Sequence, residues 1–322
     1  MKAAVYYSTG DPDVLTYEDV PDATVTPDGV LLEVKAIGIQ GGDVLSRARG
    51  VMASTPHIVG YQTAGIVRAV GANVTGVEVG QRVVGTAPFG SHAELRVTRS
   101  HTTWPIPDEM PFEIAAGIPI EFGTADDCLF EFGHLVAGET VLVQAAAGGV
   151  GISAVQLAKR AGATVIGTAS SDERLARLHD YGLDVAINYA TTDVAAAVMD
   201  ATGGRGADLV VDSVGGATLE GSIAALAYRG RISWVGSAGR DPNPPSLAGL
   251  GAKNATITGV YLGAEHATNP DRAWAMIARL IDRVAAGDLT VVVDSTFPLA
   301  EAAAAHRHIE SRQAFGRVVL IP

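Results

Sequence analysis

A strand-like segment, a glycine-rich loop and a helix-like segment follow one another at residues 140–161, and this succession limits the fold most. The apolar run TVLVQ (140–144) leads into AAAGGVG (145–151), and that loop leads into ISAVQLAKRA (152–161). Glycines in such a loop cost chain entropy, so they indicate that something comes close to this backbone. A parallel strand that turns into a helix through glycines is typical of a pyrophosphate site, because the helix N-terminus offers free N–H groups.

The glycine loop by itself is weak support, since Ala146 stands where the G-x-G-x-x-G pattern begins and a tight structural turn is the alternative. Apolar strand-like runs and helical stretches continue to alternate after it, which predicts a parallel sheet covered on both faces. We therefore predict an α/β fold with a doubly wound Rossmann domain and a six-stranded parallel sheet. The expected strands are 140–144, 163–170, 184–189, 208–214, 230–236 and 255–262, and the expected helices are 149–161, 172–181, 192–201 and 216–228.

The rest of the chain has a different pattern. Short β-branched runs cut by Gly, Pro and Asn predict strands at 30–39, 64–74 and 80–88, and a helical pattern begins within 107–118. Near the end, the pattern predicts a helix at 271–287, a strand pair, a further helix and a last strand in GRVVLIP (316–322). The length of 322 residues suits about two domains.

Composition excludes several classes of protein. Hydrophobic residues make up 48% of the chain and charged residues 18%, which favours a large buried core over disorder. The net charge of −12 argues against nucleic-acid partners and anionic membrane surfaces. Cys128 is the single cysteine, so an internal disulfide and a cysteine-rich zinc lobe are excluded. The N-terminus lacks the apolar region of a signal peptide, and we expect a cytoplasmic protein.

The tip of the second parallel strand indicates which dinucleotide is bound. An NAD site usually places an acidic residue there to hold the ribose hydroxyls. Here the tip reads TASS (168–171), and the acids Asp172 and Glu173 belong to the helix that follows. Arg174 can pair with a 2′-phosphate, although a solvated helix charge is its alternative reading, and Tyr189 can stack on the adenine. These features favour NADPH over NADH.

Two further loops, DSVGG (212–216) and VGSAG (235–239), follow strands at the same edge of the predicted sheet, where ligands bind. Ordinary turn chemistry is the alternative for both loops, and a surface role is the alternative for Arg312. The predicted cofactor-binding residues are Gly148, Gly149, Val150, Thr168, Ser170, Ser171, Arg174, Tyr189, Ser213, Val214, Gly236, Ser237, Ala238, Leu262 and Arg312.

Several of these segments carry a resemblance. The loop AAAGGVG, the runs GTASSDER (167–174), INYA (187–190) and GRISWVGSAG (230–239), and the terminal HIESRQAFGRVVLIP (308–322) resemble the medium-chain dehydrogenase/reductase superfamily, in particular its quinone oxidoreductase (zeta-crystallin-like) branch. The resemblance implies a GroES-like catalytic domain at 1–121, completed by 263–322, and a Rossmann NADPH-binding domain at 122–262. It also implies a homodimer formed through the sheet-edge strand near 255–262.

Zinc-dependent members of the superfamily carry ligands that this chain replaces. Gln40 stands at the Cys position in GIQGGD (38–43), while Tyr61 and Gln62 stand at the His and Glu positions in GYQTAG (60–65). An amide and a phenol are poor zinc ligands beside imidazole and thiolate, so we predict no catalytic zinc. The third ligand region, GIPIEFGT (117–124), offers Ile120 or Glu121. The histidines look scattered, and HRH (306–308) is expected on an exposed helix face.

The chain also departs from the branch around the expected substrate pocket. The stretch DVLSRARGVMAS (43–54) lacks the tyrosines that the branch carries there, and GIPIEFGTADD (117–127) looks slightly longer than in the branch. Both departures bear on quinone specificity and leave the cofactor prediction unchanged.

Without zinc, alcohol oxidation lacks its Lewis acid, whereas reduction of a conjugated C=C remains open. Hydride at the β-carbon leaves an enolate, which needs a hydrogen-bond donor and then a proton. The candidate catalytic residues are Tyr61, Gln40 and Thr124, and for each the alternative is a structural polar group. We expect Gln62 and Thr63 to be structural and Asp43 to cap the turn that follows it. The predicted activity is NADPH-dependent reduction of a quinone or of an enone or enal.

Two other readings stay open. One is a tailoring enoyl reductase that acts on a polyketide or acyl-thioester intermediate, with Arg47, Arg49 and Arg68 as candidates for a basic entrance. The other is a protein that binds NADPH without redox activity. Turnover of NADPH with a simple quinone separates an enzyme from such a binding protein.

Overall fold

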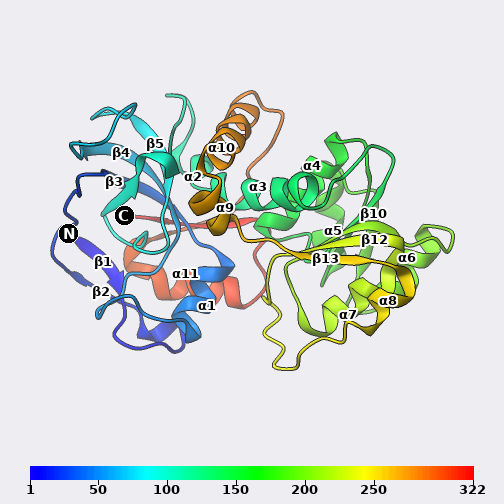
Figure 1. Cartoon of the computed structure of the whole chain (residues 1–322). Helices are drawn as coiled ribbons and strands as arrows, with labels where there is room; N and C mark the ends of the chain where they lie inside the picture. The colour runs from blue at the N-terminus through cyan, green and yellow to red at the C-terminus, as the bar shows by residue number, and fades with distance from the viewer. The chain divides into compact units, whose positions relative to one another are not determined.

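The computed structural model describes the whole chain, residues 1–322, which forms two compact units (Figure 1). The discontinuous unit consists of Met1–Ile120 and Gly263–Pro322, and the inserted unit consists of Glu121–Leu262. Each unit has a sheet of its own. The inserted unit is α/β, and the discontinuous unit is dominated by antiparallel strands.

The inserted unit contains a six-stranded sheet with strands in the order β10-β9-β8-β11-β12-β13, all of them parallel. This order confirms the predicted doubly wound α/β fold. All four residues of β8 are buried, as expected for a strand covered on both faces. The strands are β8 (Thr140–Val143), β9 (Thr164–Ala169), β10 (Val185–Asn188), β11 (Ala207–Asp212), β12 (Leu226–Trp234) and β13 (Thr256–Gly259).

Helices cover both faces of this sheet, with α4 on one side and α7 and α8 on the other (Figure 1). The helices are α3 (Pro119–Asp126), α4 (Gly149–Arg160), α5 (Asp172–Leu178), α6 (Val194–Ala201), α7 (Gly216–Ala225) and α8 (Ala248–Lys253). The π-helix Asp127–Glu131 continues from α3.

One sequence prediction was wrong in detail here. The helix predicted to run to residue 228 ends at Ala225, and β12 begins already at Leu226. The physical reason is that Leu226 is buried and pairs with Ala207 of β11, so tertiary pairing overrides local helix propensity. The candidate residue Thr124 lies in α3.

The discontinuous unit holds a two-stranded sheet of β1 and β2 and a larger sheet in the order β14-β15-β3-β4-β5-β7, with β6 also paired to β3. Its strands are β1 (Lys2–Val5), β2 (Thr16–Asp19), β3 (Gly29–Gly38), β4 (Gln62–Val70), β5 (Arg82–Thr86), β6 (Leu95–Arg99), β7 (Thr103–Pro105), β14 (Val293–Pro298) and β15 (Arg317–Ile321). Its helices are α1 (Gly41–Arg49), α2 (Phe112–Ala115), α9 (Leu262–Thr268), α10 (Pro270–Ala285) and α11 (Ala302–Glu310).

The helical pattern predicted from residue 107 starts later than expected. Residues 107–110 form a turn in which Met110 N–H donates to the Pro107 carbonyl, and α2 begins at Phe112. Pro111 is the N-cap residue and has an extended ψ of 142°. Helical geometry begins with the next residue, Phe112. The proline therefore separates the turn from the helix.

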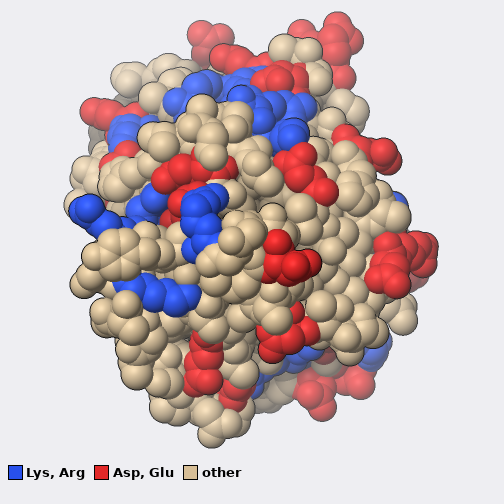
Figure 2. All heavy atoms as spheres, turned by 90° about the vertical axis from the view of Figure 1, so that its right-hand side faces the viewer, with Lys and Arg blue, Asp and Glu red and all other residues tan.

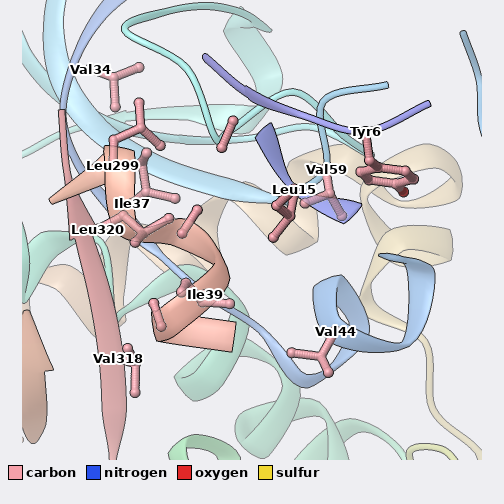
Figure 3. Close-up of a cluster of buried hydrophobic side chains, with 13 residues drawn as sticks. Tyr6, Leu15, Val34, Ile37, Ile39, Val44, Val59, Leu299, Val318 and Leu320 are labelled. Atoms are coloured by element: carbon pink, nitrogen blue, oxygen red, sulfur yellow. The ribbon is translucent and has the colours of Figure 1, made fainter. Parts of the chain in front are cut away.

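The last segment of the chain completes the core of the discontinuous unit. Val318 and Leu320 of β15 pack with Ile37 of β3 and with Leu299, which precedes α11 (Figure 3). Val44 of α1 belongs to the same cluster. Burial of such apolar side chains contributes about 25 cal/mol per Å². The helix α1, which carries part of the candidate site, is therefore held by residues from both ends of the chain.

His306 corrects the prediction that residues 306–308 form an exposed face. Its side chain is fully buried in α11, and its Nε2 lies 3.0 Å from Nε2 of His92, which is also fully buried. The helix turns this position inward, while Arg307 is exposed and His308 contacts Asp294 at 2.7 Å. The sequence HRH alone does not reveal which of its residues faces the core.

None of the helices is apolar over enough residues to cross a lipid bilayer. On the face seen in Figure 2, acidic and basic side chains form small separate groups on a largely uncharged surface. That face shows no continuous basic field of the kind that binds nucleic acid.

Candidate functional site

The glycine loop connects β8 to α4 in the inserted unit. Gly148 is the N-cap residue in extended geometry (φ −84°, ψ 171°), and Gly149 is the first residue of α4. Ala145 has a φ of 51°, and Gly148 N–H donates to the Ala145 carbonyl at 3.0 Å, so the chain reverses within a few residues. The first turn of α4 carries no acidic side chain, which leaves its N-terminal N–H groups suited to an anion.

Gly148 and Gly151 have different roles in this loop. A Cβ on Gly151 would lie 2.6 Å from Ala146 Cα, so its absence permits close packing of helix against strand. A Cβ on Gly148 would find its nearest neighbour only at 3.5 Å, the Ala145 carbonyl. The loop therefore leaves room beside its backbone at the helix N-terminus, as the binding of a dinucleotide pyrophosphate requires.

Thr168, predicted to bind the cofactor, is part of the scaffold of the loop. It is fully buried, its hydroxyl donates to Gln144 Oε1 at 2.8 Å, and it accepts a hydrogen bond from Ala145 N–H at 3.1 Å. Gln144 in turn donates to Ser222 at 3.0 Å. Thr168 and Gln144 thus fix the start of the glycine loop through side-chain contacts across neighbouring strands.

Ser170, Ser171 and Arg174 lie together at the tip of β9. Arg174 Nη1 donates to Ser170 Oγ at 3.2 Å, and Ser171 caps α5 by accepting from Arg174 N–H at 3.4 Å. Asp172 accepts a hydrogen bond from Asn188 Nδ2 at 2.8 Å, and Asn188 ends the neighbouring strand β10. The guanidinium and two hydroxyls form a group that fits a phosphate.

Tyr189 belongs to the same edge of the sheet. It follows β10 directly, its N–H donates to the Ala169 carbonyl at 3.1 Å, and its ring is 44% exposed. An exposed aromatic ring beside the Ser170–Arg174 group is available to stack on a planar base.

The loops after β11 and β12 are joined to each other. Ala238 N–H donates to the Ser213 carbonyl at 3.1 Å, and Gly239 N–H donates to the Val214 carbonyl at 2.9 Å. Gly236 would meet no atom within 4 Å if it carried a Cβ, so the backbone is accessible there. Ser237, between these positions, lies close to Gly215.

Asp212 holds the first of these loops, and sequence reasoning did not single it out. It is fully buried at the end of β11, where its carboxylate accepts from Val214 N–H and Gly215 N–H, both at 2.9 Å, and from Ser222 at 2.7 Å. The sequence feature that could have indicated this role is the position of Asp212, an acidic residue at the end of a run of apolar strand residues.

The remaining predicted cofactor residues are less closely grouped. Val150 lies in the first turn of α4 beside Gly149, and Leu262 is buried at the end of the inserted unit. Arg312 is exposed and belongs to the discontinuous unit, after α11, with a φ of 59°.

In the discontinuous unit, the candidate donors meet at the N-terminal end of α1. Gln40 is the N-cap residue and is 4% exposed. Its N–H donates to Asp43 Oδ2 at 2.8 Å, so Asp43 is structural, but its side chain reaches back to the N-cap residue and does not cap the turn that follows it. The capped turn fixes the backbone that carries Gln40.

Tyr61 leans on the same turn. A Cβ on Gly42 would lie 2.5 Å from the Tyr61 hydroxyl oxygen, so the phenol packs directly on the helix backbone. The hydroxyl lies 3.4 Å from Ser46 Oγ, and the side chain is half-buried. Gln40 and Tyr61 are therefore brought to one end of α1, whereas Thr124, which is 5% exposed, lies in the inserted unit.

Gln62 is structural, as expected. It is fully buried, its Nε2 donates to the Ala116 carbonyl at 2.5 Å, and its Oε1 accepts from Ile120 N–H at 3.0 Å. Both ends of the amide are thus used within the protein, and Gln40 and Tyr61 offer an amide and a phenol. This donor set does not fit zinc.

The structure contains no group of three or more His, Cys, Asp or Glu side chains placed to hold a metal ion. Cys128 is fully buried, and burial raises the pKa of its thiol well above the usual value. It is therefore neither a thiolate ligand nor a nucleophile.

Two of the three arginines considered for a basic entrance are already paired. Arg47 is fully buried, and its Nη2 lies 2.6 Å from Glu310 Oε1. Arg68 forms an ion pair with Glu33. Arg49, the third of them, is exposed. The expectation for Arg47 was wrong because α1 turns this residue toward α11.

Two domain families match the chain. Residues 26–108 match the alcohol dehydrogenase GroES-like domain, and residues 149–279 match the family described as zinc-binding dehydrogenase. The second description names zinc, but this chain has Gln40, Tyr61 and Gln62 at the ligand positions.

Proteins of known activity match over the full length. The chain is 35% identical to a quinone oxidoreductase of Pseudomonas aeruginosa, covering 100% of the chain and 99% of that protein. It is 34% identical to a 2-haloacrylate reductase of Burkholderia sp, covering 99% and 98%. It is also 33% identical to a part of a phenolphthiocerol/phthiocerol polyketide synthase subunit of Mycobacterium tuberculosis, covering 99% of the chain and 15% of that protein.

A solved structure agrees with these matches. The Escherichia coli quinone oxidoreductase, determined in complex with NADPH, superimposes with a TM-score of 0.95 at 29% identity, covering 100% of both chains. The chain therefore belongs to the quinone oxidoreductase branch of the medium-chain dehydrogenase/reductase superfamily.

Proposed function

We propose that this chain is an NADPH-dependent reductase that transfers hydride to a quinone or to the conjugated C=C of an enone or enal. The observation that carries the proposal is the sheet edge of the inserted unit. There the α4 N-terminus has no acid in its first turn, and Arg174 and Ser170 meet at the strand tip where an NAD site would place an acid.

The residues proposed to hold NADPH follow from this edge. Gly148, Gly149 and Val150 would place their backbone against the pyrophosphate, while Ser170, Ser171 and Arg174 would hold the 2′-phosphate. Tyr189 would stack on the adenine. The remaining positions would contribute backbone or supporting contacts: Thr168, Ser213, Val214, Gly236, Ser237, Ala238, Leu262 and Arg312.

NADPH supplies the hydride, and the chain must meet the charge that develops on the substrate. Hydride at the β-carbon moves negative charge to the carbonyl oxygen, where one oriented donor is worth about two orders of magnitude or more in rate. The Tyr61 hydroxyl would be that donor, because it is half-buried and fixed against Gly42. Gln40 would orient the substrate from the same end of α1, and Thr124 would support the cofactor.

Two relatives support a conjugated C=C as the acceptor. Their named substrates are a quinone and a 2-haloacrylate, and in both the C=C is conjugated with a C=O group, which is a ketone in the quinone and a carboxylate in the haloacrylate. A panel of quinones, 2-enals and enones, followed by NADPH absorbance, tests the proposal. Turnover with NADPH that exceeds turnover with NADH supports it. Tight NADPH binding with no turnover across the panel would leave the alternative of a binding protein without redox activity.

An acyl thioester is the second candidate substrate, because part of a polyketide synthase subunit matches the whole chain. Against it, Arg47 is buried and paired with Glu310, whereas Arg68 is exposed and forms a surface ion pair with Glu33. Enoyl thioesters with and without a phosphopantetheine arm separate the cases. A strong preference for the phosphorylated arm would favour the tailoring reductase.

The domain roles and the assembly are part of the same proposal. Residues 1–121 with 263–322 would form the catalytic domain, and residues 122–262 the NADPH-binding domain. The strand β13 lies at the edge of the six-stranded sheet, which makes it available for strand pairing with a second copy near residues 255–262. Exposed Tyr228 and Tyr261 lie on and after the strands at this edge, and sedimentation would test for the homodimer.

A further inference from the structure

Arg96 is a buried cation in the discontinuous unit that the proposed chemistry does not use. It lies on β6 and is 2% exposed. Burial lowers the pKa of its guanidinium to about 9, with the charge of Asp43 acting in the opposite direction, so the group stays protonated at neutral pH. A buried charge of this kind is costly unless fixed dipoles surround it.

Backbone carbonyls surround this guanidinium. Nη2 lies 2.7 Å from the Tyr61 carbonyl oxygen and 2.8 Å from that of Ala87. It also lies 3.1 Å from the Phe89 carbonyl and 3.2 Å from the Gly60 carbonyl. Two N–H groups on one nitrogen must therefore be shared among four acceptors, which join the chain entering β4 to the chain leaving β5.

Arg96 differs from Arg47, the other fully buried arginine discussed above, in the kind of group that it contacts. Arg47 is equally buried, but it pairs with the carboxylate of Glu310. The hydrogen-bond partners of Arg96 are four carbonyls and the hydroxyl of Thr63, at 3.4 Å from Nη1. A structural ion pair explains Arg47 and does not explain Arg96.

The segment that Arg96 holds carries the proposed donor. The Tyr61 carbonyl accepts from Arg96 and also from Ala87 N–H at 2.9 Å, so the main chain at this residue is fixed from two directions. Gly60, before it, has a φ of 109°, and a Cβ there would overlap Ser91. The phenol leaves this fixed backbone and reaches the first turn of α1.

We propose that Arg96 is a positioning residue that acts through Tyr61, holding the backbone of the 60–61 segment so that the phenol keeps its place at α1. The inference rests on the proposed function of Tyr61 as the enolate donor. A donor displaced by a fraction of an ångström loses much of its effect on rate, because catalysis depends on pre-arranged geometry.

A double-mutant cycle on the full-length protein tests the inference. The variants are R96K, R96Q, Tyr61→Phe and the two double substitutions, assayed by NADPH oxidation with a quinone substrate. R96K keeps the positive charge, but its ammonium group cannot reach all four carbonyls. R96Q keeps N–H donors without the charge, and it replaces R96K in the test if R96K does not fold. R82K is the matched control, because Arg82 on β5 also donates to a backbone carbonyl, that of Met110, and contacts neither α1 nor the 60–61 segment. Thermal unfolding and NADPH binding confirm that each variant is folded.

We expect R96K to lower kcat at least tenfold, with the KM for NADPH changed less than twofold, and R82K to leave kcat within twofold. In the Tyr61→Phe background, R96K should change kcat less than twofold, because the donor it positions is gone. Equal losses in both backgrounds, or an unchanged kcat for folded R96K and R96Q, would overturn the inference and leave Tyr61 as donor. If Tyr61→Phe alone costs less than threefold, the proposed donor fails, and the inference fails with it.

Discussion

The glycine loop of the inserted unit and the Tyr61 end of α1 are both candidate ligand sites, but they are held in different ways. The loop is shaped by its own backbone and by neighbouring strand ends, as in the bond from Ala146 N–H to the Thr168 carbonyl at 2.8 Å. Tyr61 is held by Arg96, a side chain from a distant strand. The glycine-loop site can therefore be predicted from a short sequence motif, whereas the geometry of the Tyr61 site depends on tertiary contacts.

The largest expected effect breaks the local site. Gly151→Ala would bring a methyl group to 2.6 Å from Ala146 Cα and 2.7 Å from its carbonyl carbon, both of them backbone atoms that cannot move aside. Overpacking of this kind costs about 3 kcal/mol at the upper end of its usual range. We expect the apparent Tm to fall and NADPH affinity to drop in a thermal-shift titration.

Gly221→Ala is the matched control for this substitution. It also lies within a helix of the inserted unit, but a Cβ there would meet no atom within 4 Å. We expect it to raise stability by about 0.5–1 kcal/mol, because alanine loses less chain entropy. A Gly151→Ala protein as stable as the Gly221→Ala protein would contradict the packing role of Gly151.

The next effect concerns the site held at long range. Tyr61→Phe removes the hydroxyl and keeps the ring against Gly42, so kcat should fall about 100-fold while NADPH affinity changes little. Steady-state kinetics with a quinone and an enone measure both quantities. Tyr7→Phe is the matched control, since Tyr7 is exposed in the same unit and its hydroxyl donates to Glu18. A loss below threefold for Tyr61→Phe would make the phenol a space filler.

The same contrast explains how far the sequence could predict this molecule. The parallel sheet, the glycine loop and the Ser170–Arg174 group follow from periodicity and short motifs, which act between near neighbours in the chain. Gln62 was placed among the structural residues, but its partners Ala116 and Ile120 were not foreseeable.

Arg96, His306 and Asp212 mark what the sequence left unpredicted. Arg96 and His306 are polar residues whose partners come from other segments of the chain, such as His92 for His306. Asp212 bonds instead to near neighbours, Val214, Gly215 and Ser222, but its pattern does not show that it is buried. Arginine and histidine side chains are exposed to solvent in most proteins, so the local sequence pattern predicts exposure for Arg96 and His306. Their role becomes clear only once the tertiary partners are known.

A smaller effect tests the phosphate group of the loop site. Arg174→Ala removes a guanidinium that lies 3.2 Å from Ser170 Oγ, so the KM for NADPH should rise and that for NADH should stay nearly unchanged. Loss of one charge-assisted contact amounts to about 2 kcal/mol, or roughly 30-fold. Arg177→Ala, on the same helix, is the control and should change neither value. Equal losses for both cofactors would contradict the assignment to the 2′-phosphate.

The buried histidine pair behind the Tyr61 segment makes the discontinuous unit sensitive to acid. Burial lowers the pKa of His92 to about 3 and that of His306 well below its usual value, and Arg96 and Arg47 add to the effect. The unfolded chain therefore binds protons below about pH 6.5 that the folded chain excludes. Stability should fall as the pH is lowered, by about 1.4 kcal/mol per pH unit for each imidazole.

His306→Gln should reduce this slope, because one of the two titrating imidazoles is gone while an amide can still contact His92. Apparent Tm values measured between pH 7.5 and 5.5 test this expectation. Partly buried His266, whose pKa is lowered to about 4, leaves part of the slope in the variant. Identical slopes in both proteins would show that the pair does not titrate with folding.

The smallest expected effect is none at all, on removal of metal. Zinc relatives hold their ion in the region where this chain has Gln40 and Tyr61, and here the neighbouring amide of Gln62 is used by Ala116 and Ile120. Amide and phenol oxygens bind zinc far more weakly than thiolate and imidazole, so prolonged chelation should leave kcat and Tm unchanged. Metal analysis of the purified protein should find no stoichiometric zinc. The prediction would be contradicted by one tightly held zinc per chain that is lost together with activity. In that case the Tyr61 end of α1 would be a metal site, and the long-range contacts around it would position zinc ligands and not a hydrogen-bond donor.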